Sequence, residues 1–511
     1  MSQKQFSRFQ PWEVVLPNHI EMFGTEILDA GKRAAWCRAF FYAGTTLRLW
    51  NEAPELKAAL LSACALKDVT RLVLICKYGE ESELVPALQS LLPSDCEMEV
   101  REIGRQAMDV FSNLTSSSDN QLQWDFDYFD TLADGSVDRV ILFGAVSHIR
   151  SLESCANNIC RVLRDGGRVI IADTPWGGKD LAAAANMDAH LEGFLARILS
   201  GMGIEIEDLP DTGVESLKSA FEPLLNWSRV FSWRGLFLFY GQNGANENRL
   251  SLGPLPATDA VDKFIALKQT QSPWDLISEV EKYVLGPDVI NPAVQRNWGR
   301  AVFFSGNLDW MYTRAGNMLH IMYQNLKAKK GDKVLVIGEK LEVLGFLPEL
   351  RKLVGETGEI ASFDMVGASH KAYKQQWKMG PDQFVEEKHR WDYPFADTYP
   401  DNYFDMVWLP QGVHHARSWE EIAPRLLRVL KTGRQVMMIE NRTCPPAFFK
   451  AIEINGFLRC IAEKVYWGMD TTFEEMPDYT TLDLESAFGN SLTDIFSLEW
   501  KGWLLFWGYK K

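Results

Sequence analysis

Two adjacent histidines, His414 and His415, follow the apolar run "MVWLPQGV" at residues 406–413. An imidazole titrates near neutral pH and can take a proton from a reacting group, so both are candidates for a catalytic base. His415 has a counterpart, His148, in an earlier segment, and we favour a structural role for it, in which the ring donates to a backbone carbonyl. The counterpart of His414 is Ser147, which makes His414 the stronger catalytic candidate.

A glycine and an acidic residue form a second candidate site. Gly338 ends the apolar run "KVLVIG", and Asp364 ends the next one, "EIASFD". In an open α/β sheet, ligands bind beyond the carboxyl ends of the strands, and an acid there can accept both hydroxyls of a ribose. Capping of the following helix is the ordinary alternative for an Asp. Because a second acid, Glu102, stands at the matching place earlier in the chain, we favour a nucleoside site.

The sequence segments that would position these residues occur twice in the chain, as an internal repeat. Pro11 to Glu13 return as Pro273 to Asp275 at an offset of 262 residues, and the segment 124–151 returns as 391–418 at an offset of 267. A repeat of this length is a whole domain. We therefore expect two domains, residues 1–245 and 246–511, joined by the segment from Gly241 to Asp259, which is rich in Gly, Asn and Pro.

Each half alternates apolar strands with amphipathic helices, which predicts an α/β fold with a mostly parallel sheet covered by helices on both faces. The last two strands of each half read as an antiparallel pair at the sheet edge. The long segments 175–230 and 442–495 are expected to cover the mouth of the site as a lid. A helix beginning near Ser151 is expected to stop at Gly166 and Gly167.

The second half resembles the class I S-adenosylmethionine-dependent methyltransferases, in particular the broad group of ubiquinone/menaquinone-type and other small-molecule methyltransferases. Four blocks carry the resemblance, and the last two are specific in combination. They are "GDKVLVIG" (331–338), "LVGETGEIASFD" (353–364), "WDYPFADTYPDNYFDMV" (391–407) and "LLRVLKTGRQVMMIE" (426–440).

The resemblance implies two tandem Rossmann-like methyltransferase domains, with S-adenosylmethionine as the cofactor of the second. It implies that Asp364 binds the ribose and that Asp392, with Trp391 beside it, lies near the adenine. For Asp392 an ordinary turn residue is an equally good interpretation. The full set of cofactor-binding residues that it implies is Gly338, Glu339, Asp364, Met365, Trp391, Asp392, Pro410 and Gln411.

The chain also departs from the family pattern. Val336 stands where the family has an acid, and Lys340 and Glu342 stand where it has glycines. Side chains at these places are expected to hinder the close approach of the backbone to a ligand. The first half has Cys76 at the place of Gly338 but keeps Glu102 at that of Asp364. We therefore expect a degenerate first half that shapes the pocket or forms a pseudo-symmetric interface, as in a fused dimer.

Composition narrows the function further. The net charge of −15 argues against nucleic-acid binding, which requires neutralisation of phosphates. The eight cysteines include no CxxC pair, which favours reduced thiols in the cytoplasm and no metal site. We find no apolar run long enough for a membrane span and no signal peptide. Association of the fused pair into a homo-oligomer stays open.

The leading hypothesis is S-adenosylmethionine-dependent methyl transfer to a small aromatic or lipophilic metabolite. One alternative is a non-catalytic methyltransferase-like binding or scaffold protein. Another is an enzyme that binds S-adenosylmethionine and catalyses a different reaction. The amino-terminal helical stretches of the two halves share four pairs of equivalent residues. We expect these residues to pack a helix against the sheet of their own half, and docking of the two halves is the less favoured alternative. These pairs are Trp36/Trp298, Arg38/Arg300, Phe41/Phe303 and Gly44/Gly306.

Overall fold

The computed structural model describes most of the chain in a series of segments. Among its described residues, no helix combines the length and the apolar character needed to cross a bilayer. The described residues are 12, 20, 23–51, 53–77, 81–103, 127–174, 178–209, 213–233, 235–244, 272–275, 277, 282, 286–304, 315–338, 341, 345–364, 394–416, 418–442, 444–469, 471–473 and 479–511.

The amino-terminal half contains a six-stranded sheet in the order β2-β1-β3-β4-β6-β5. Its strands are β1 (Arg71–Lys77), β2 (Glu97–Ile103), β3 (Val137–Phe143), β4 (Leu163–Asp173), β5 (Trp227–Trp233) and β6 (Leu236–Gln242). Its helices and 3-10 turns are η2 (Thr25–Leu28), α2 (Ala30–Tyr42), α3 (Thr45–Asn51), α4 (Pro54–Cys64), η3 (Leu66–Asp68), α5 (Glu81–Gln89), η4 (Asp127–Thr131), η5 (Val146–His148), α7 (Leu152–Val162), α8 (Gly178–Ala185), α9 (Ala189–Met202), η6 (Ile206–Asp208) and α10 (Val214–Phe221).

The carboxy-terminal half contains a second sheet in the matching order, β8-β7-β9-β10-β12-β11. Its strands are β7 (Lys333–Gly338), β8 (Glu359–Asp364), β9 (Phe404–Pro410), β10 (Leu430–Asn441), β11 (Leu492–Trp500) and β12 (Trp503–Lys510). Its helices and 3-10 turns are η7 (Pro287–Ile290), α13 (Pro292–Phe304), α15 (Gly316–Asn325), α16 (Phe346–Val354), η9 (Pro394–Thr398), η10 (Val413–His415), α18 (Trp419–Val429), α19 (Pro446–Ile454), α20 (Gly456–Gly468), α21 (Thr481–Phe488) and η11 (Gly489–Ser491).

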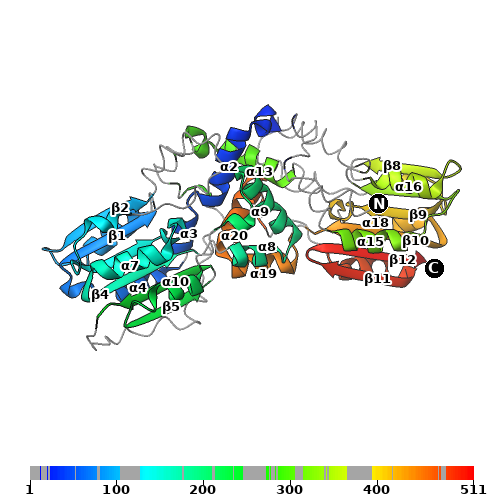
Figure 1. The fold of residues 1–511 in the computed structure, drawn as a ribbon. Helices are drawn as coiled ribbons and strands as arrows, with labels where there is room; N and C mark the ends of the chain where they lie inside the picture. Colours follow the sequence, from blue (N-terminus) through cyan, green and yellow to red (C-terminus); the bar gives the residue numbers. More distant parts are fainter. Residues whose placement is uncertain are drawn as a thin grey trace.

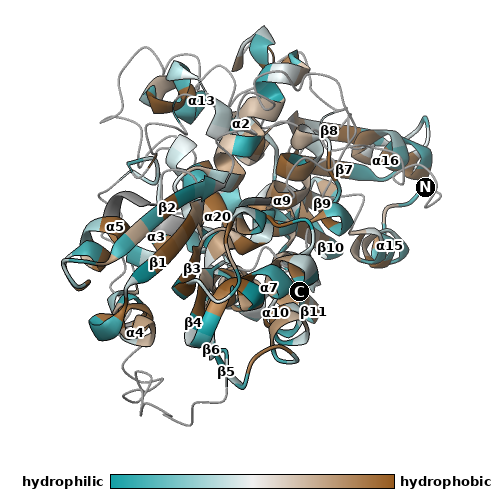
Figure 2. Cartoon of the chain, turned by 60° about the vertical axis from the view of Figure 1, so that its left-hand side comes forward, coloured by the Kyte–Doolittle hydropathy of each residue, from teal (hydrophilic) through white to brown (hydrophobic). Residues whose placement is uncertain are grey.

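The predicted fold class is confirmed. In each sheet four strands are parallel, and the last two strands of the half form the antiparallel pair at one edge. Apolar cores lie on both faces of each sheet, with α7 and α10 on one face of the first and α4 on the other. Figure 2 shows the hydrophobic colour along much of the strands β1 and β3, as expected for strands covered on both faces.

The repeat extends to the backbone of the two halves. The helix α2 is matched by α13 at an offset of 262 residues, and α9 is matched by α20 at 267. The strand registers agree as well, because Cys76 pairs with Glu102 as Gly338 pairs with Asp364. Each residue in one half can therefore be compared with a known position in the other.

The two sheets lie on opposite sides of a central group of helices (Figure 1). This group contains α2, α8 and α9 from the first half and α13, α19 and α20 from the second, and their apolar side chains form a single core. The rings of Trp36 and Trp298 stack on each other 6.0 Å apart with an interplanar angle of 16°. The favoured interpretation of these residues as helix-on-sheet packing was therefore wrong, since this pair joins the two halves.

Two further expectations need correction. The helix α7 ends at Val162 and not at the glycines, because Leu163 already pairs with Val137 in the sheet. The backbone of Gly166 and Gly167 instead exchanges hydrogen bonds with Asn243, at 2.8 and 2.9 Å. The expected linker also begins too early, because its first two residues, 241 and 242, belong to β6. The expected domain boundary at 245/246 lies outside the described residues.

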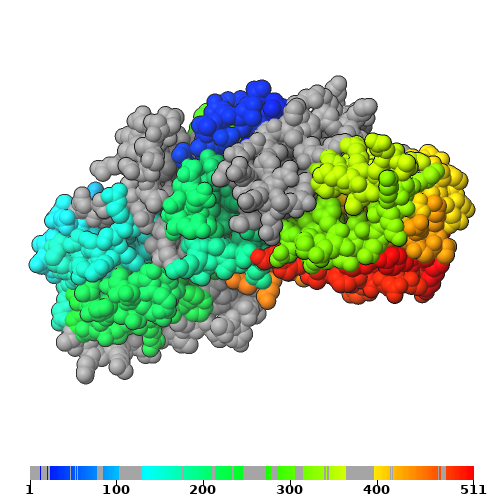
Figure 3. Space-filling model, turned by 45° about the vertical axis from the view of Figure 1, so that its right-hand side comes forward, coloured from blue at the N-terminus to red at the C-terminus, as the bar shows by residue number. Residues whose placement is uncertain are grey.

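The two long insertions do not act as a single layer over their own sheets. In each, the last helix, α10 or α21, returns to pack on the sheet beside α7 or α18. The preceding helices, α8 and α9 or α19 and α20, belong to the central core between the halves. Figure 3 shows the teal surface of residues near 180–200 beside the red surface of the carboxy-terminal hairpin.

Candidate functional site

The turn that follows β9 adopts an unusual backbone conformation. Gln411 is fully buried and has a φ of 58°, in the left-handed region that residues other than glycine adopt at a cost. Its N–H donates to the carbonyl of Ile439 at 2.8 Å. The equivalent residue of the first half is Gly144, with a φ of 61° and the matching bond to Ala172. The second half therefore keeps a side chain where the backbone favours glycine, as is common at functional sites.

The carboxylate of Glu440, at the end of β10, fixes the same turn. Its Oε2 accepts from the N–H groups of Val413 and His414 at 2.7 and 3.2 Å, and its Oε1 accepts from that of Asn441 at 2.9 Å. The side chain is almost entirely buried. Because the bonds come from backbone groups, the carboxylate holds the turn whatever side chains the turn carries.

In the first half, the shorter side chain of an aspartate makes the equivalent hydrogen bonds to the backbone. Asp173 accepts from the N–H groups of Val146, Ser147 and Thr174 at 2.8, 3.3 and 2.6 Å. Sequence reasoning missed this role of Glu440, although a signal was present. An acid stands at equivalent positions near the ends of the matching strands, Asp173 in β4 and Glu440 in β10, and the repeat alone could have identified it.

The imidazole of His414 lies against this carboxylate. Its Nδ1 is 3.0 Å from Oε2 of Glu440, and about a quarter of the side chain is exposed. A buried carboxylate beside one ring nitrogen is the arrangement that orients an imidazole in general-base catalysis. In the first half Ser147 takes this place, and its hydroxyl donates to the carbonyl of Thr174 at 3.3 Å. Only the second half has an imidazole at this position.

The end of β7 approaches the end of β9 closely. A Cβ atom on Gly338 would lie 1.8 Å from the carbonyl oxygen of Pro410, and one on Gly412 would lie 2.9 Å from that of Ile337. Gly338 is thus required by the contact between strand ends in the second half. This steric requirement explains the glycine without a ligand, and it places Gly338 beside the turn that carries Gln411 and His414.

Comparison with known proteins agrees with this architecture. A sequence model described as "Methyltransferase domain" matches residues 103–171, within the amino-terminal half. The ubiquinone/menaquinone biosynthesis C-methyltransferase UbiE of Stutzerimonas stutzeri is 25% identical over 188 residues, which cover 35% of this chain and 62% of the relative. The protein of the same name from Hydrogenovibrio crunogenus is 28% identical over 113 residues, which cover 21% of this chain and 42% of the relative.

By these matches the chain is similar to the class I S-adenosylmethionine-dependent methyltransferases. It spans 62% and 42% of the length of these two relatives. Among solved structures, it is similar to a SAM-dependent methyltransferase from Aquifex aeolicus, with 18% identity over 37% of this chain and 87% of the other and a TM-score of 0.23. It is also similar to phosphoethanolamine N-methyltransferase 2 of Haemonchus contortus, with 11% identity over 90% and 98% of the two chains and a TM-score of 0.24.

The structure brings together part of the predicted site. Gly338, Pro410, Gln411 and His414 meet where β7 and β9 end. For Asp364 and His415 the structure describes the backbone, which places them at the end of β8 and in η10. The predicted residues Glu339, Met365, Trp391 and Asp392 lie outside the described residues, as do Lys340 and Glu342.

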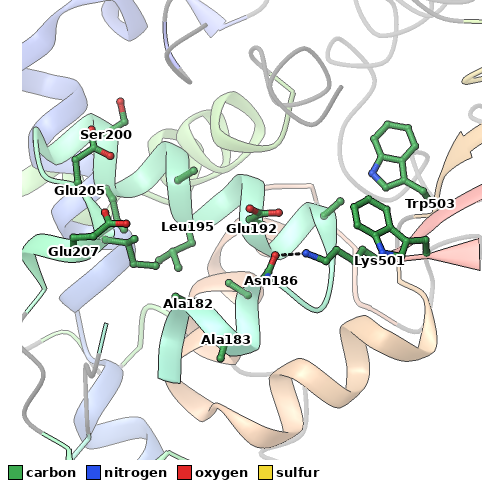
Figure 4. A pocket seen from close by; sticks show the side chains of 16 residues that line it. Ala182, Ala183, Asn186, Glu192, Leu195, Ser200, Glu205, Glu207, Lys501 and Trp503 are labelled. Carbon is green, nitrogen blue, oxygen red and sulfur yellow. Dashed lines mark hydrogen bonds between the residues drawn. The ribbon is translucent and has the colours of Figure 1, made fainter. Parts of the chain in front are cut away.

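A groove of about 680 Å³ borders this edge of the second sheet and is shared by both halves. One wall comes from α8, α9 and the residues after α9, and the other from the turn between β11 and β12 (Figure 4). Glu192 projects from the helix wall, whereas Lys501 and Trp503 come from the opposite one. Because Trp503 pairs with Asn441 at the end of β10, the groove lies next to the strand that carries Glu440.

Proposed function

We propose that the carboxy-terminal half binds S-adenosylmethionine and transfers its methyl group to a small aromatic or lipophilic acceptor. The observation that carries this proposal is the pairing of His414 with the buried carboxylate of Glu440, at 3.0 Å. The pair lies at the carboxyl ends of the parallel strands β9 and β10, the edge where ligands of such sheets bind.

His414 would act as the base that removes the proton of the acceptor. With its Nδ1 3.0 Å from Oε2 of Glu440, the ring would present Nε2 as the proton acceptor. The carboxylate then stabilises the imidazolium that forms when the proton is taken up. Because Glu440 also binds the N–H groups of Val413 and His414, ring and backbone are held by one side chain.

The residues at this edge fit a nucleoside cofactor in two respects. Asp364 ends β8 directly beside Gly338, in the register that places an acid next to the first strand end. Gln411 supplies a buried amide in a conformation that glycine would adopt more easily. Together with the other predicted residues named above, they would hold S-adenosylmethionine, which when bound supplies an electrophilic methyl group.

The first half supports this site without repeating its chemistry. It matches the methyltransferase family model at residues 103–171, yet it has Ser147 in place of His414 and Cys76 in place of Gly338. Family similarity here follows the strands and helices of the scaffold, whereas the imidazole–carboxylate pair is found in the second half. We infer that the first half is a partner domain.

A scaffold or binding function is the second candidate. It is favoured by the loss of the family's acid at Val336 and of glycines at Lys340 and Glu342. A protein that binds the cofactor without methyl transfer would share these features.

An assay with methyl-labelled S-adenosylmethionine and a panel of uncharged aromatic acceptors separates these candidates. We expect wild-type turnover, a loss of roughly 10²–10⁴-fold in His414→Gln, as is typical for removal of a general base, and unchanged turnover in the matched variant Ser147→Ala. S-adenosylhomocysteine should bind His414→Gln as it binds wild type. Full activity of His414→Gln would refute the assigned base, and cofactor binding without any turnover would favour the second candidate.

A further inference from the structure

The helix α9 of the first half begins at the active-site edge of the second half. The N–H of Ala189, its first residue, donates to the carbonyl of Lys501 in the turn between β11 and β12, at 3.1 Å. The contact is tight, because a Cβ atom on Gly502 would lie 2.5 Å from Oδ2 of Asp188. Asp188 also caps α9, with its Oδ1 accepting from the second and third N–H groups beyond it.

This turn adjoins the end of the strand that carries Glu440. Leu504 and Trp503 pair with Glu440 and Asn441, and the N–H of Arg442 donates to the carbonyl of Gly502 at 2.7 Å. The first turn of α9 therefore lies close to the proposed catalytic pair, although it belongs to the other half of the chain.

The second residue of α9, His190, is buried there among aromatic rings. Its ring stacks on Phe303 of α13 at 5.7 Å with an interplanar angle of 24°, and it lies 5.9 Å from the ring of Phe194. Neither ring nitrogen has a hydrogen-bond partner among the described residues. A buried polar group without a partner is costly, so a residue of this kind calls for an explanation.

The other half shows that an imidazole is not needed for packing at this place. The residue equivalent to His190 is Phe457, which begins α20 in the same way and contacts Phe41, the equivalent of Phe303, at 4.8 Å. The reciprocal docking is also present, since a Cβ atom on Gly235 would lie 3.0 Å from the backbone nitrogen of Gly456. A phenylalanine therefore fills the position where the first half contributes an imidazole.

The charge state of His190 narrows what it could bind. Burial, and to a smaller extent the electrostatic influence of nearby His414, lowers the pKa of His190 to about 3. The ring is thus neutral at physiological pH and offers one donor and one acceptor. With the carboxylates of Glu440 and Asp188 close to the same edge, an anionic ligand is disfavoured and an uncharged hydroxyl group fits best.

We propose that His190, from the amino-terminal half, is a substrate-binding residue of the carboxy-terminal site, where its ring nitrogens bind a hydroxyl group of an uncharged acceptor. The inference rests on the proposed function. It explains why the site needs both halves, and it gives the first half a direct part in recognition although it lacks the catalytic pair.

Phenol, with toluene as the matched probe without a hydroxyl group, tests this proposal by calorimetry on the full chain with and without S-adenosylhomocysteine. We expect wild type to bind phenol and His190→Phe to bind it about tenfold more weakly, as for the loss of one or two hydrogen bonds. Toluene should bind both proteins equally. The matched variant Phe457→His should bind phenol as wild type does.

The same variants distinguish recognition from packing. We expect His190→Phe to keep its affinity for S-adenosylhomocysteine and to melt at least as high as wild type, because phenylalanine fits the equivalent place in the other half. Equal binding of phenol by wild type and His190→Phe, or no binding by either, would overturn the proposal. A wild type that binds phenol through His190 but not S-adenosylhomocysteine would instead refute the proposed function alone.

Discussion

Single residues of this chain can be interpreted by comparison with the equivalent residue of the other half, which lies at a known offset in the sequence. Gln411 and Gly144 occupy the same turn with φ values of 58° and 61°, so one half tolerates a strained side chain that the other avoids. His414 and Ser147 differ in the same way. These differences cluster at the carboxyl end of β9, where the proposed catalytic pair lies.

Replacement of Gln411 by glycine should stabilise the protein and weaken its cofactor site. A non-glycine residue in the left-handed region carries a strain of order 1 kcal/mol, which glycine relieves. We expect the free energy of unfolding in urea to rise by up to about 1 kcal/mol, and the affinity for S-adenosylhomocysteine to fall. Loss of stability without loss of affinity would show that Gln411 serves packing and not binding.

At the scale of elements, the contact between α13 and α20 depends on two glycines. A Cβ atom on Gly468 would lie 2.5 Å from the Cα of Gly299, and one on Gly299 would lie 2.7 Å from that of Gly468. The backbones of the two helices therefore touch, as they do at other small-residue crossings. In the first half the equivalent pair is Cys37 and Gly201, where a Cβ atom on the glycine would meet the Cys37 sulfur.

Substitution of Gly468 by alanine should separate these helices. Overpacking of this kind costs roughly 1–3 kcal/mol, and the atoms nearest to the added methyl group are backbone atoms that cannot rotate away. Gly316→Ala, at the start of α15, is the control, because no atom lies within 4 Å of a Cβ built there. Thermal unfolding should show a lower melting temperature for the first variant and an equal or higher one for the second. Equal melting of both would contradict the described crossing.

The elements themselves were largely predictable from the sequence. The strand β7 coincides with the run "KVLVIG", because a strand buried on both faces is apolar throughout. The end of α7 was not predictable, since Gly166 and Gly167 bind Asn243, which is far away in sequence. Local patterns identify helices and strands, whereas tertiary hydrogen bonds decide where they end.

The candidate site was predictable only in part. Residues at strand ends, such as Gly338 and His414, follow from the fold class and the position of the strands. The role of Glu440 requires the path of the turn after β9, and that of His190 requires the arrangement of the two halves. Neither can be read from the spacing of residues within one half.

At the scale of the whole molecule, the two halves are joined as the subunits of a symmetric dimer would be. Arg197 of α9 donates to the carbonyl of Ala301 at 3.3 Å, and the equivalent Lys464 of α20 donates to that of Ala39 at 3.2 Å. Each contact is the counterpart of the other, which is the defining property of an isologous interface. Lys464 also donates to Phe40 and Thr45, so its ammonium group makes three hydrogen bonds.

This shared centre predicts that the chain unfolds as one unit. The central core contains apolar side chains from both halves. If one half unfolded, the core side chains of the other half would be exposed to water, which is unfavourable. We expect a single transition in scanning calorimetry, with a van't Hoff enthalpy equal to the calorimetric one. Two resolved transitions would show that the halves are stable separately and that the central contacts are weak.

The most direct test of the account is a calorimetric titration of the full chain with S-adenosylhomocysteine. It should be carried out on wild type and on the matched variants Asp364→Ala and Glu102→Ala, which alter the same strand-end position in the two halves. We expect one site per chain, lost in Asp364→Ala and retained in Glu102→Ala. Binding that is lost only in Glu102→Ala, or no binding by wild type, would contradict the assignment of the cofactor to the carboxy-terminal half.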